Sequence, residues 1–362
     1  MKHRSSAALA LAALVAVATP ALAAAGTGAA TASVSSRAAA AASTGTDIRV
    51  ASFNVQSVSL DRTSGAQRPW KERRNTIVSQ ILNGRVDVIG VQEVNPSKSF
   101  ASRLRNPANG NQYFDLRAGL NHFGTDHYSL QTGAAANCVD ATTTYKCVYK
   151  NRRASGGDRI LFNTRTLRQV TFGYTGYTRT GANNPVAGVT WSKLAVRATG
   201  AQFLFVTTHL DPSSKSIRLA QWKQLISTVN KVKGNLPVVA TGDYNTHRGD
   251  VMSAEMLPAM KKAGYGDVLN QQFGENKQVG VRAESLSHAW VNTVNHTDLN
   301  VRNYSWDDRR ANLGYTIDYV FASNALRVKA YKLVLRFSAT KLRVLGTLPS
   351  DHNMVRATIT IP

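Results

Sequence analysis

Apolar segments that end in polar residues of a few recurring types restrict the fold of this chain most. One of them, Leu236–Ala240, contains Pro237 and leads through Gly242 into Asp243 and Asn245. A short Val-rich run bounded by Pro and Gly predicts a buried strand that ends in a turn. In sheets covered by helices, ligands and catalytic groups gather at such strand ends.

The same ending recurs along the chain. The polar residues at or beside a predicted strand end are Asn54, Glu93, His209, Asp243, Asn245, Asp318, Asp351 and His352. Singly, an Asp or Asn there is usually a turn former, and a lone His is usually structural. Together, carboxylates and amides without thiolates suit Mg²⁺, Mn²⁺ or Ca²⁺ rather than zinc. Two histidines beside carboxylates add groups for acid and base chemistry.

Helical spacing appears between these strands. Ile77, Ile81 and Leu82 lie on one face of a helix that ends at Asn83, and residues 216–232 show the same periodicity. Residues 157–172 and 190–199 are typical of antiparallel strands. This mixture predicts an α/β protein.

The N-terminus is typical of a secretory signal in residues 1–23. An apolar core, Ala7–Ala18, follows two basic residues and precedes small residues at Ala21 and Ala23. An uncleaved membrane anchor is the alternative, but the core is short and weakly hydrophobic for a span. We therefore expect a secreted, extracellular protein without stable membrane insertion.

Beyond this signal, residues 24–46 are mostly Ala, Ser, Thr and Gly and predict a disordered leader. One folded domain is expected over residues 47–362. The chain has two cysteines, Cys138 and Cys147, and in an exported protein they are most simply a disulfide. Zinc would need more ligands than that segment offers.

The formal net charge of +23 favours a polyanionic partner. Basic segments at residues 71–74 (KERR), 150–153 (KNRR) and 307–310 (DDRR) point the same way. The alternative is a generally basic secreted protein that charge repulsion keeps soluble.

Six short motifs carry a resemblance to a known family. They occur in the family's order and are SFNVQ (52–56), DVIGVQEV (87–94), TTHLD (207–211), GDYN (242–245), IDYVFAS (317–323) and SDHNMV (350–355). The chain thus resembles the endonuclease/exonuclease/phosphatase superfamily, which has the fold of deoxyribonuclease I. The resemblance implies an α/β (α+β) four-layer sandwich, with two mixed β-sheets packed face to face, helices outside and the site at one end.

The resemblance also implies a metal site. Glu93 would be the principal ligand, with Asn54 and Asp351 close to the ion. Mg²⁺ is the expected ion, with Mn²⁺ or Ca²⁺ as alternatives.

Catalytic roles follow from the same resemblance. Asp243 and Asn245 would align the attacking water and hold the phosphate. His352 would donate to a phosphate oxygen or shuttle a proton, and Asp318 would orient it.

His209 matches the family's second histidine, which some members pair with a carboxylate. Asp158 is the candidate partner here, although the usual acid is a Glu at a slightly different offset. Asp211 is a second candidate.

Three functional hypotheses remain. The preferred one is a secreted, monomeric, metal-dependent phosphodiesterase that acts on nucleic acid as a nuclease. The second is a sphingomyelinase-type enzyme acting on phospholipid head groups, for which residues 172–180 are a weak candidate for an exposed aromatic hairpin. The third is a non-catalytic polyanion-binding module, which predicts loss of a key site residue; none is lost.

Overall fold

A computed structural model describes residues 45–61, 66, 68–94, 112–124, 127–131, 140–143, 146–148, 157–182, 187–248, 251–269, 282–305 and 313–362. These residues all belong to one compact unit, Ser43–Pro362. The predicted signal (residues 1–23), residues 24–44 of the predicted leader, Cys138 and two basic segments (150–153 and 307–310) lie outside the described residues. Among the residues described, no helix has the length and apolar character needed to cross a membrane.

The first of two large sheets has seven strands in the order β12-β14-β17-β1-β2-β6-β3. Their bounds are β1 Thr46–Asn54, β2 Val88–Gln92, β3 Tyr128–Leu130, β6 Arg159–Asn163, β12 Ser285–Ser287, β14 Arg327–Val334 and β17 Met354–Ile361. Strand β1 runs antiparallel to β17 and parallel to β2. Asn54 pairs with Gln92, so this register brings Asn54 next to Glu93.

The second sheet has six strands in the order β11-β13-β10-β9-β8-β7. Their bounds are β7 Leu167–Gly176, β8 Gly188–Val196, β9 Gln202–His209, β10 Val238–Asp243, β11 Tyr265–Asp267 and β13 Asp318–Ser323. Asp243 pairs with His209 on parallel β9 and with Asp318 on antiparallel β13. The register therefore aligns three predicted site residues across neighbouring strands.

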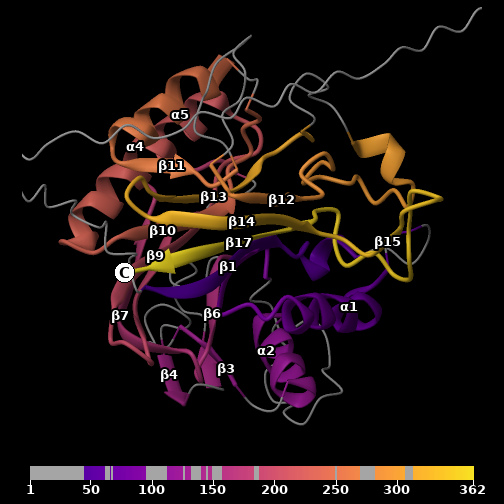
Figure 1. Cartoon of the computed structure of the whole chain (residues 1–362), viewed down its shortest axis with the longest axis horizontal. Helices are drawn as coiled ribbons and strands as arrows, with labels where there is room; N and C mark the ends of the chain where they lie inside the picture. The colour runs from indigo at the N-terminus through magenta and orange to yellow at the C-terminus, as the bar shows by residue number, and fades with distance from the viewer. Residues whose placement is uncertain are drawn as a thin grey trace, which may run out of the picture. The chain divides into compact units, whose positions relative to one another are not determined.

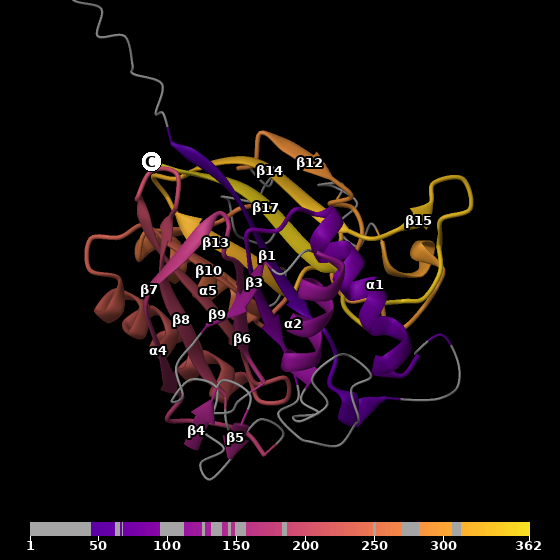
Figure 2. The same cartoon turned by 90° about the horizontal axis from the view of Figure 1, so that it is seen from below.

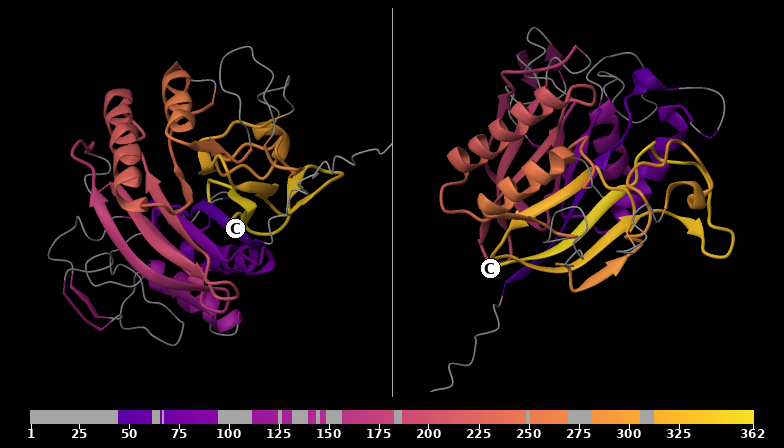
Figure 3. Two further views of the ribbon diagram at one scale, coloured as in Figure 1. Left: turned by 60° about the vertical axis from the view of Figure 1, so that its left-hand side comes forward. Right: turned by 90° about the horizontal axis from the view of Figure 1, so that it is seen from above.

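Helices cover the outer faces of both sheets, which gives four layers (Figures 1 and 3). Helices α1 (Trp70–Asn83) and α2 (Gln112–Phe123) pack on the first sheet, and α4 (Lys215–Lys233) and α5 (Val251–Lys262) pack on the second. Between the sheets, apolar residues of both interlock, among them Val50, Phe205 and Val239. The predicted four-layer α/β sandwich is confirmed.

Short elements lie in the connections between these strands and helices. They are the 3₁₀ helices η1 (Val58–Leu60) and η4 (Val301–Tyr304), the pair β4 (Asp140–Thr143) and β5 (Lys146–Val148), and the pair β15 (Phe337–Ser338) and β16 (Arg343–Val344). Gly90 on β2 lets the sheets approach beneath the site, because a Cβ atom there would collide with the hydroxyls of Thr207 and Thr241.

One expectation about charge is wrong. The segment 71–74 is not a basic surface patch, because it opens α1 and turns two arginines inward. Arg73 is 1% exposed and Arg74 is 9% exposed. Arg74 pairs with Asp115 of α2 at 3.2 Å, so this charge is neutralised inside the protein.

Candidate active site

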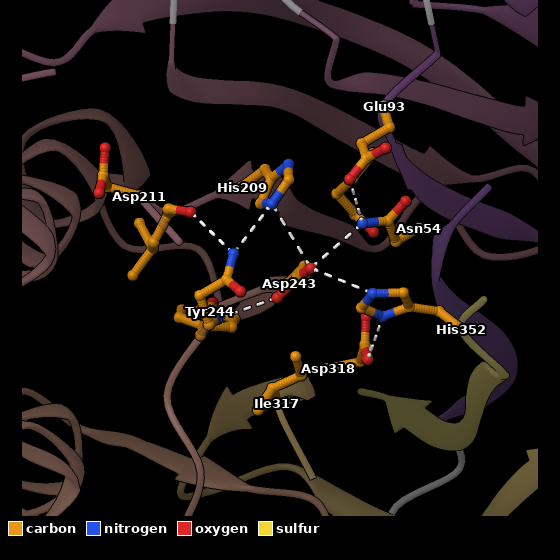
Figure 4. A network of polar contacts seen from close by, with 12 residues as sticks. Asn54, Glu93, His209, Asp211, Asp243, Tyr244, Ile317, Asp318 and His352 are labelled. Atoms are coloured by element: carbon orange, nitrogen blue, oxygen red, sulfur yellow. Dashed lines mark hydrogen bonds and ion pairs between the residues drawn. The ribbon is translucent and has the colours of Figure 1, made fainter. Parts of the chain in front are cut away.

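The strand ends bring most of the predicted site residues together (Figure 4). Asn54 ends β1, His209 ends β9, Asp243 ends β10 and Asp318 begins β13. His352 lies two residues before β17. Residues from both sheets thus meet at one end of the sandwich, as predicted.

Asp243 lies at the centre of this cluster and is 1% exposed. Its Oδ2 lies 3.1 Å from Nδ2 of Asn54, 3.4 Å from Nε2 of His209 and 3.7 Å from Nε2 of His352 (Figure 4). The backbone N–H of Asn245 donates to Oδ1 at 2.9 Å. Both histidine distances exceed an ordinary hydrogen bond, so each imidazole faces Asp243 as an ion-pair partner rather than as a tight hydrogen-bond donor.

His352 and Asp318 form a buried pair. Nδ1 of His352 lies 2.9 Å from Oδ2 of Asp318. Burial alone would lower the pKa of His352, but the carboxylates of Asp318 and Asp243 raise it well above its ordinary value. Burial raises the pKa of Asp318 to about 6, although His352 opposes this. The pair is therefore an imidazolium and a carboxylate at neutral pH.

His209 has different partners. Burial lowers its pKa, but Asp243, Glu93 and Asp158 outweigh burial and raise it. Nε2 also lies 3.0 Å from Nδ2 of Asn245, which can donate only while Nε2 is unprotonated. His209 can therefore exchange a hydrogen bond from Asn245 for an ion pair with Asp243 when it gains a proton.

The two candidate partners of His209 do not bond its side chain in the described part of the chain. Asp158 accepts the backbone N–H of His209, and burial raises the pKa of Asp158 to about 6. Asp211 turns away (Figure 4) and its Oδ1 accepts the N–H groups of Ser213 and Ser214 before α4. Asp158 therefore acts on His209 by accepting its backbone N–H and by its negative charge. Asp211 instead stabilises the loop before α4.

Glu93 and Asn245 both have positive φ angles, 61° and 47°. This conformation is tolerated by Asn but costs a Glu about 1–3 kcal/mol, so surrounding contacts must hold it. Oε1 of Glu93 accepts Nδ2 of Asn54 at 2.9 Å, and Oε2 accepts the backbone N–H of Ser57 at 3.0 Å. Nδ2 of Asn245 donates to the carbonyl of Leu210 at 2.9 Å.

The predicted metal ligands offer oxygen atoms that suit a hard cation. Glu93 and Asp351 are half-buried, and the Ser350 hydroxyl lies 2.7 Å from the Asn54 carbonyl oxygen and 3.1 Å from Oδ1 of Asp351. Asn54 donates from its amide nitrogen to Glu93 and to Asp243 and thereby positions both carboxylates. The acidic groups among the predicted metal ligands are Glu93 and Asp351. The residues present fit a divalent ion.

A second group also satisfies the geometry for a metal. Ligand atoms of Asp243, Asp318 and His352 lie within 4.8 Å of one another. However, the raised pKa of His352 keeps its imidazole protonated, and a protonated nitrogen has no lone pair to offer. We therefore favour Glu93 and Asp351.

Sequence reasoning missed Arg73, which lies beneath the site. Its guanidinium donates to the carbonyls of Val55 and Pro349, to Gln56 O at 2.7 Å and to Asp61 at 3.0 Å. It thereby ties the end of β1 to the segment that carries Asp351 and His352. Its position three residues after Trp70, on the stripe that continues to Ile77, was the available signal.

Comparison with known proteins adds a family and a fold. The profile of the Endonuclease/Exonuclease/phosphatase family matches residues 51–352. A family protein from Bacteroides thetaiotaomicron has 19% identity and a TM-score of 0.60, with 88% of this chain and 99% of that chain covered. No curated protein sequence matches this chain.

Two further structures share the fold. The mannosyl-6-phosphatase of Bacteroides thetaiotaomicron has 18% identity and a TM-score of 0.59, and 86% of this chain and 99% of that chain are covered. TDP2 of D. rerio, complexed with a single-strand DNA product, has 14% identity and a TM-score of 0.54, with 87% and 99% covered. Since the family profile spans most of the chain and the fold agrees, the chain is a hydrolase of the endonuclease/exonuclease/phosphatase family.

Proposed function

We propose that this chain is an exported, metal-dependent phosphodiester hydrolase that cleaves nucleic acid. The observation that carries the proposal is the Asp243 carboxylate between two histidines of raised pKa, beside the acidic pair Glu93 and Asp351. Charged donors around one carboxylate suit a reaction in which water attacks phosphorus and an oxyanion leaves.

Glu93 and Asp351 are the residues that would hold the metal, which we take to be Mg²⁺, with Mn²⁺ or Ca²⁺ as alternatives. When bound, a divalent ion there supplies positive charge that offsets charge developing on the phosphoryl oxygens. Asn54 links the two ligands: its Nδ2 donates to Glu93 at 2.9 Å, and its carbonyl accepts the Ser350 hydroxyl, which lies 3.1 Å from Oδ1 of Asp351. These contacts support a shared place for Glu93 and Asp351.

The protein's own groups supply the proton transfers. Asp243 accepts a proton from the attacking water as the water oxygen bonds to phosphorus. His209 gives a proton to the leaving oxygen as its bond to phosphorus breaks, and the imidazolium of His352 donates to a non-bridging oxygen. Asp243 then returns its proton to His209 across the 3.4 Å that separates them.

Charge supports nucleic acid over lipid as the substrate. The net charge of +23 attracts a polyanion and raises its association rate. The weak candidate for a lipid-inserting hairpin has Tyr177 turned inward, where it is 7% exposed and its hydroxyl lies 2.7 Å from that of Thr208. A buried tyrosine cannot enter a membrane surface.

Export forms part of the proposal. We infer removal of the signal near Ala23 and a disulfide between Cys138 and Cys147, in a protein that acts as a monomer outside the cell. Intact-mass measurement on the secreted protein should give a start within a few residues of Ala23 and a mass lower by two hydrogens. Two free thiols would remove the disulfide from this account.

The test of function is a substrate panel for the mature protein, in Mg²⁺ and in EDTA. Plasmid DNA, RNA, sphingomyelin vesicles and mannose 6-phosphate make up the panel. We expect Mg²⁺-dependent cleavage of nucleic acid, with apparent affinity that falls steeply as salt rises. Glu93→Gln should lose activity and regain part of it at high Mg²⁺.

Other outcomes would redirect the assignment. Hydrolysis of sphingomyelin alone with a flat salt response would indicate the lipid enzyme. Release of phosphate from mannose 6-phosphate alone would indicate a phosphomonoesterase. Binding of nucleic acid without any hydrolysis would indicate the non-catalytic module.

A further inference from the structure

An open groove lies between α1 and the segment 332–347, on the outer face of the first sheet. Figure 2 shows α1 beside β15, with β14 and β17 behind them. The groove has a volume of about 640 Å³, which is within the range of small-molecule sites. None of the candidate active-site residues lines it.

The groove is basic. Lys332, Arg336 and Arg356 line it, and no acidic side chain does. Lys332 and Arg336 have no ion-pair partner in the part of the chain that the structure describes. Unpaired cations around a cavity favour an anionic ligand, and arginine is well suited to phosphate oxygens.

Two buried polar atoms in the groove lining also lack partners among the described residues: Nε of Arg356 and Oε1 of Gln80. Arg356 uses another nitrogen to donate to the Gly84 carbonyl at 2.8 Å. Buried polar groups are rarely left unpaired, because each loses its hydrogen bonds to water without replacement. An anion would pair with Arg356, but Oε1 of Gln80 is an acceptor and needs a hydroxyl or N–H group.

Aromatic side chains form one wall of the groove. Phe337 lines it and packs against Trp290, with ring centroids 5.8 Å apart, and against His288 at 5.0 Å. This packing fixes an apolar surface next to the cations. A ligand with a ring therefore fits better than a bare ion.

We propose that this groove binds a nucleotide-sized organic phosphate at a site separate from the catalytic centre. Lys332, Arg336 and Arg356 bind the phosphate, Gln80 accepts a hydrogen bond from a hydroxyl or N–H group, and Phe337 contacts the ring. The proposal rests on the groove alone and holds whatever substrate the active site hydrolyses.

The probe is adenosine 5′-monophosphate, titrated into the protein by calorimetry in EDTA so that hydrolysis does not occur. We expect saturable binding that the double variant Lys332→Ala/Arg336→Ala weakens by about tenfold or more, since two charge-assisted contacts are lost. Gln80→Leu should weaken the nucleotide but leave binding of inorganic phosphate unchanged. Thermal denaturation checks that each variant is folded.

Two controls separate this site from general charge and from the active site. Lys231→Ala/Lys262→Ala removes two exposed cations elsewhere and should leave the affinity unchanged. Glu93→Gln should also leave it unchanged. Equal affinity in the Lys332→Ala/Arg336→Ala variant, loss of binding in Glu93→Gln, or equal affinity for inorganic phosphate would each overturn the proposal. The proposal would also be overturned if an oligonucleotide bound through Lys332 and Arg336 while the mononucleotide did not bind.

Discussion

The two histidines beside Asp243 show how similar strand ends produce unequal groups. His352 is fixed through Nδ1 by Asp318, at 2.9 Å, and is held charged. His209 shares Nε2 between Asn245 and Asp243, and its carboxylate neighbour Asp158 bonds its backbone. The pKa of both is raised, but among the described residues only His352 has a carboxylate within hydrogen-bond distance of its Nδ1.

The difference follows from where each carboxylate lies. Asp318 pairs with Asp243 in one sheet, so its distance from the cluster is set by the strand register. Asp158 precedes β6 in the other sheet, and its short side chain must cross between sheets to approach His209. A carboxylate can therefore affect a histidine's charge without fixing its orientation.

The largest expected effect separates the histidines directly. His352→Ala should lower kcat by about 10²-fold or more with little change in KM, because it removes a fixed charged donor. His209→Ala should lower kcat by about tenfold, since solvent can replace a proton donor in part. Steady-state kinetics on bis(4-nitrophenyl) phosphate give both values. Equal losses would contradict the comparison.

Arg73 holds the backbone of the segment that carries Asp351 and His352 next to the end of β1. Arg73→Lys cannot make the separate contacts to Val55, Gln56 and Pro349, so the Mg²⁺ concentration for half-maximal activity should rise by about tenfold. Arg74→Lys is the matched control, because Arg74 pairs with Asp115 instead. An identical Mg²⁺ dependence in the two variants would show that Arg73 is only structural.

Asp318→Asn should cost a few-fold to about tenfold in kcat and change the pH profile. The carboxylate raises the pKa of His352, so its loss lowers that pKa. Protonated His352 and protonated His209 are both needed, so once the pKa of His352 falls below that of His209, activity should be lost at a lower pH than in the wild type. Asp47→Asn, at the opposite end of β1, should leave the alkaline limb in place.

Asp158→Asn should have the smallest effect on rate and a measurable effect on stability. Burial raises the pKa of Asp158 to about 6, so the proton-bound form favours folding. That contribution is present at low pH and is lost as pH rises through about 6. At pH 8 the variant should therefore be more stable by about 1–3 kcal/mol. Urea denaturation at pH 5 and 8 tests this, and a gain of equal size at both values would contradict it.

The fold and the site could be predicted in unequal measure. The strand ends that carry Asn54, His209 and Asp243 were predicted because apolar runs bounded by polar residues are local in sequence. The α2 helix was not, since residues 97–148 have no clear periodicity. Arg73 and Arg74 were misassigned to the surface because charge in the sequence does not show which face of a helix is buried.

Contacts between distant segments could not be predicted from the sequence either. No local pattern indicates that Asp211 accepts the N–H of Ser214 before α4 or that Ser350 contacts Asn54, since both contacts depend on how loops pack. The groove between α1 and the segment 332–347 belongs to the same class, because its lining comes from four separate parts of the chain.

A pH titration of the histidine side chains by NMR, on protein kept metal-free with EDTA, tests the central comparison most directly. The chain has eight histidines, so His209→Ala and His352→Ala assign the two resonances. We predict that His352 titrates well above the ordinary histidine range, that His209 titrates between that range and His352, and that Asp318→Asn lowers the pKa of His352 much more than that of His209. If both titrate together and Asp318→Asn moves neither, the account of one fixed and one exchanging histidine is wrong.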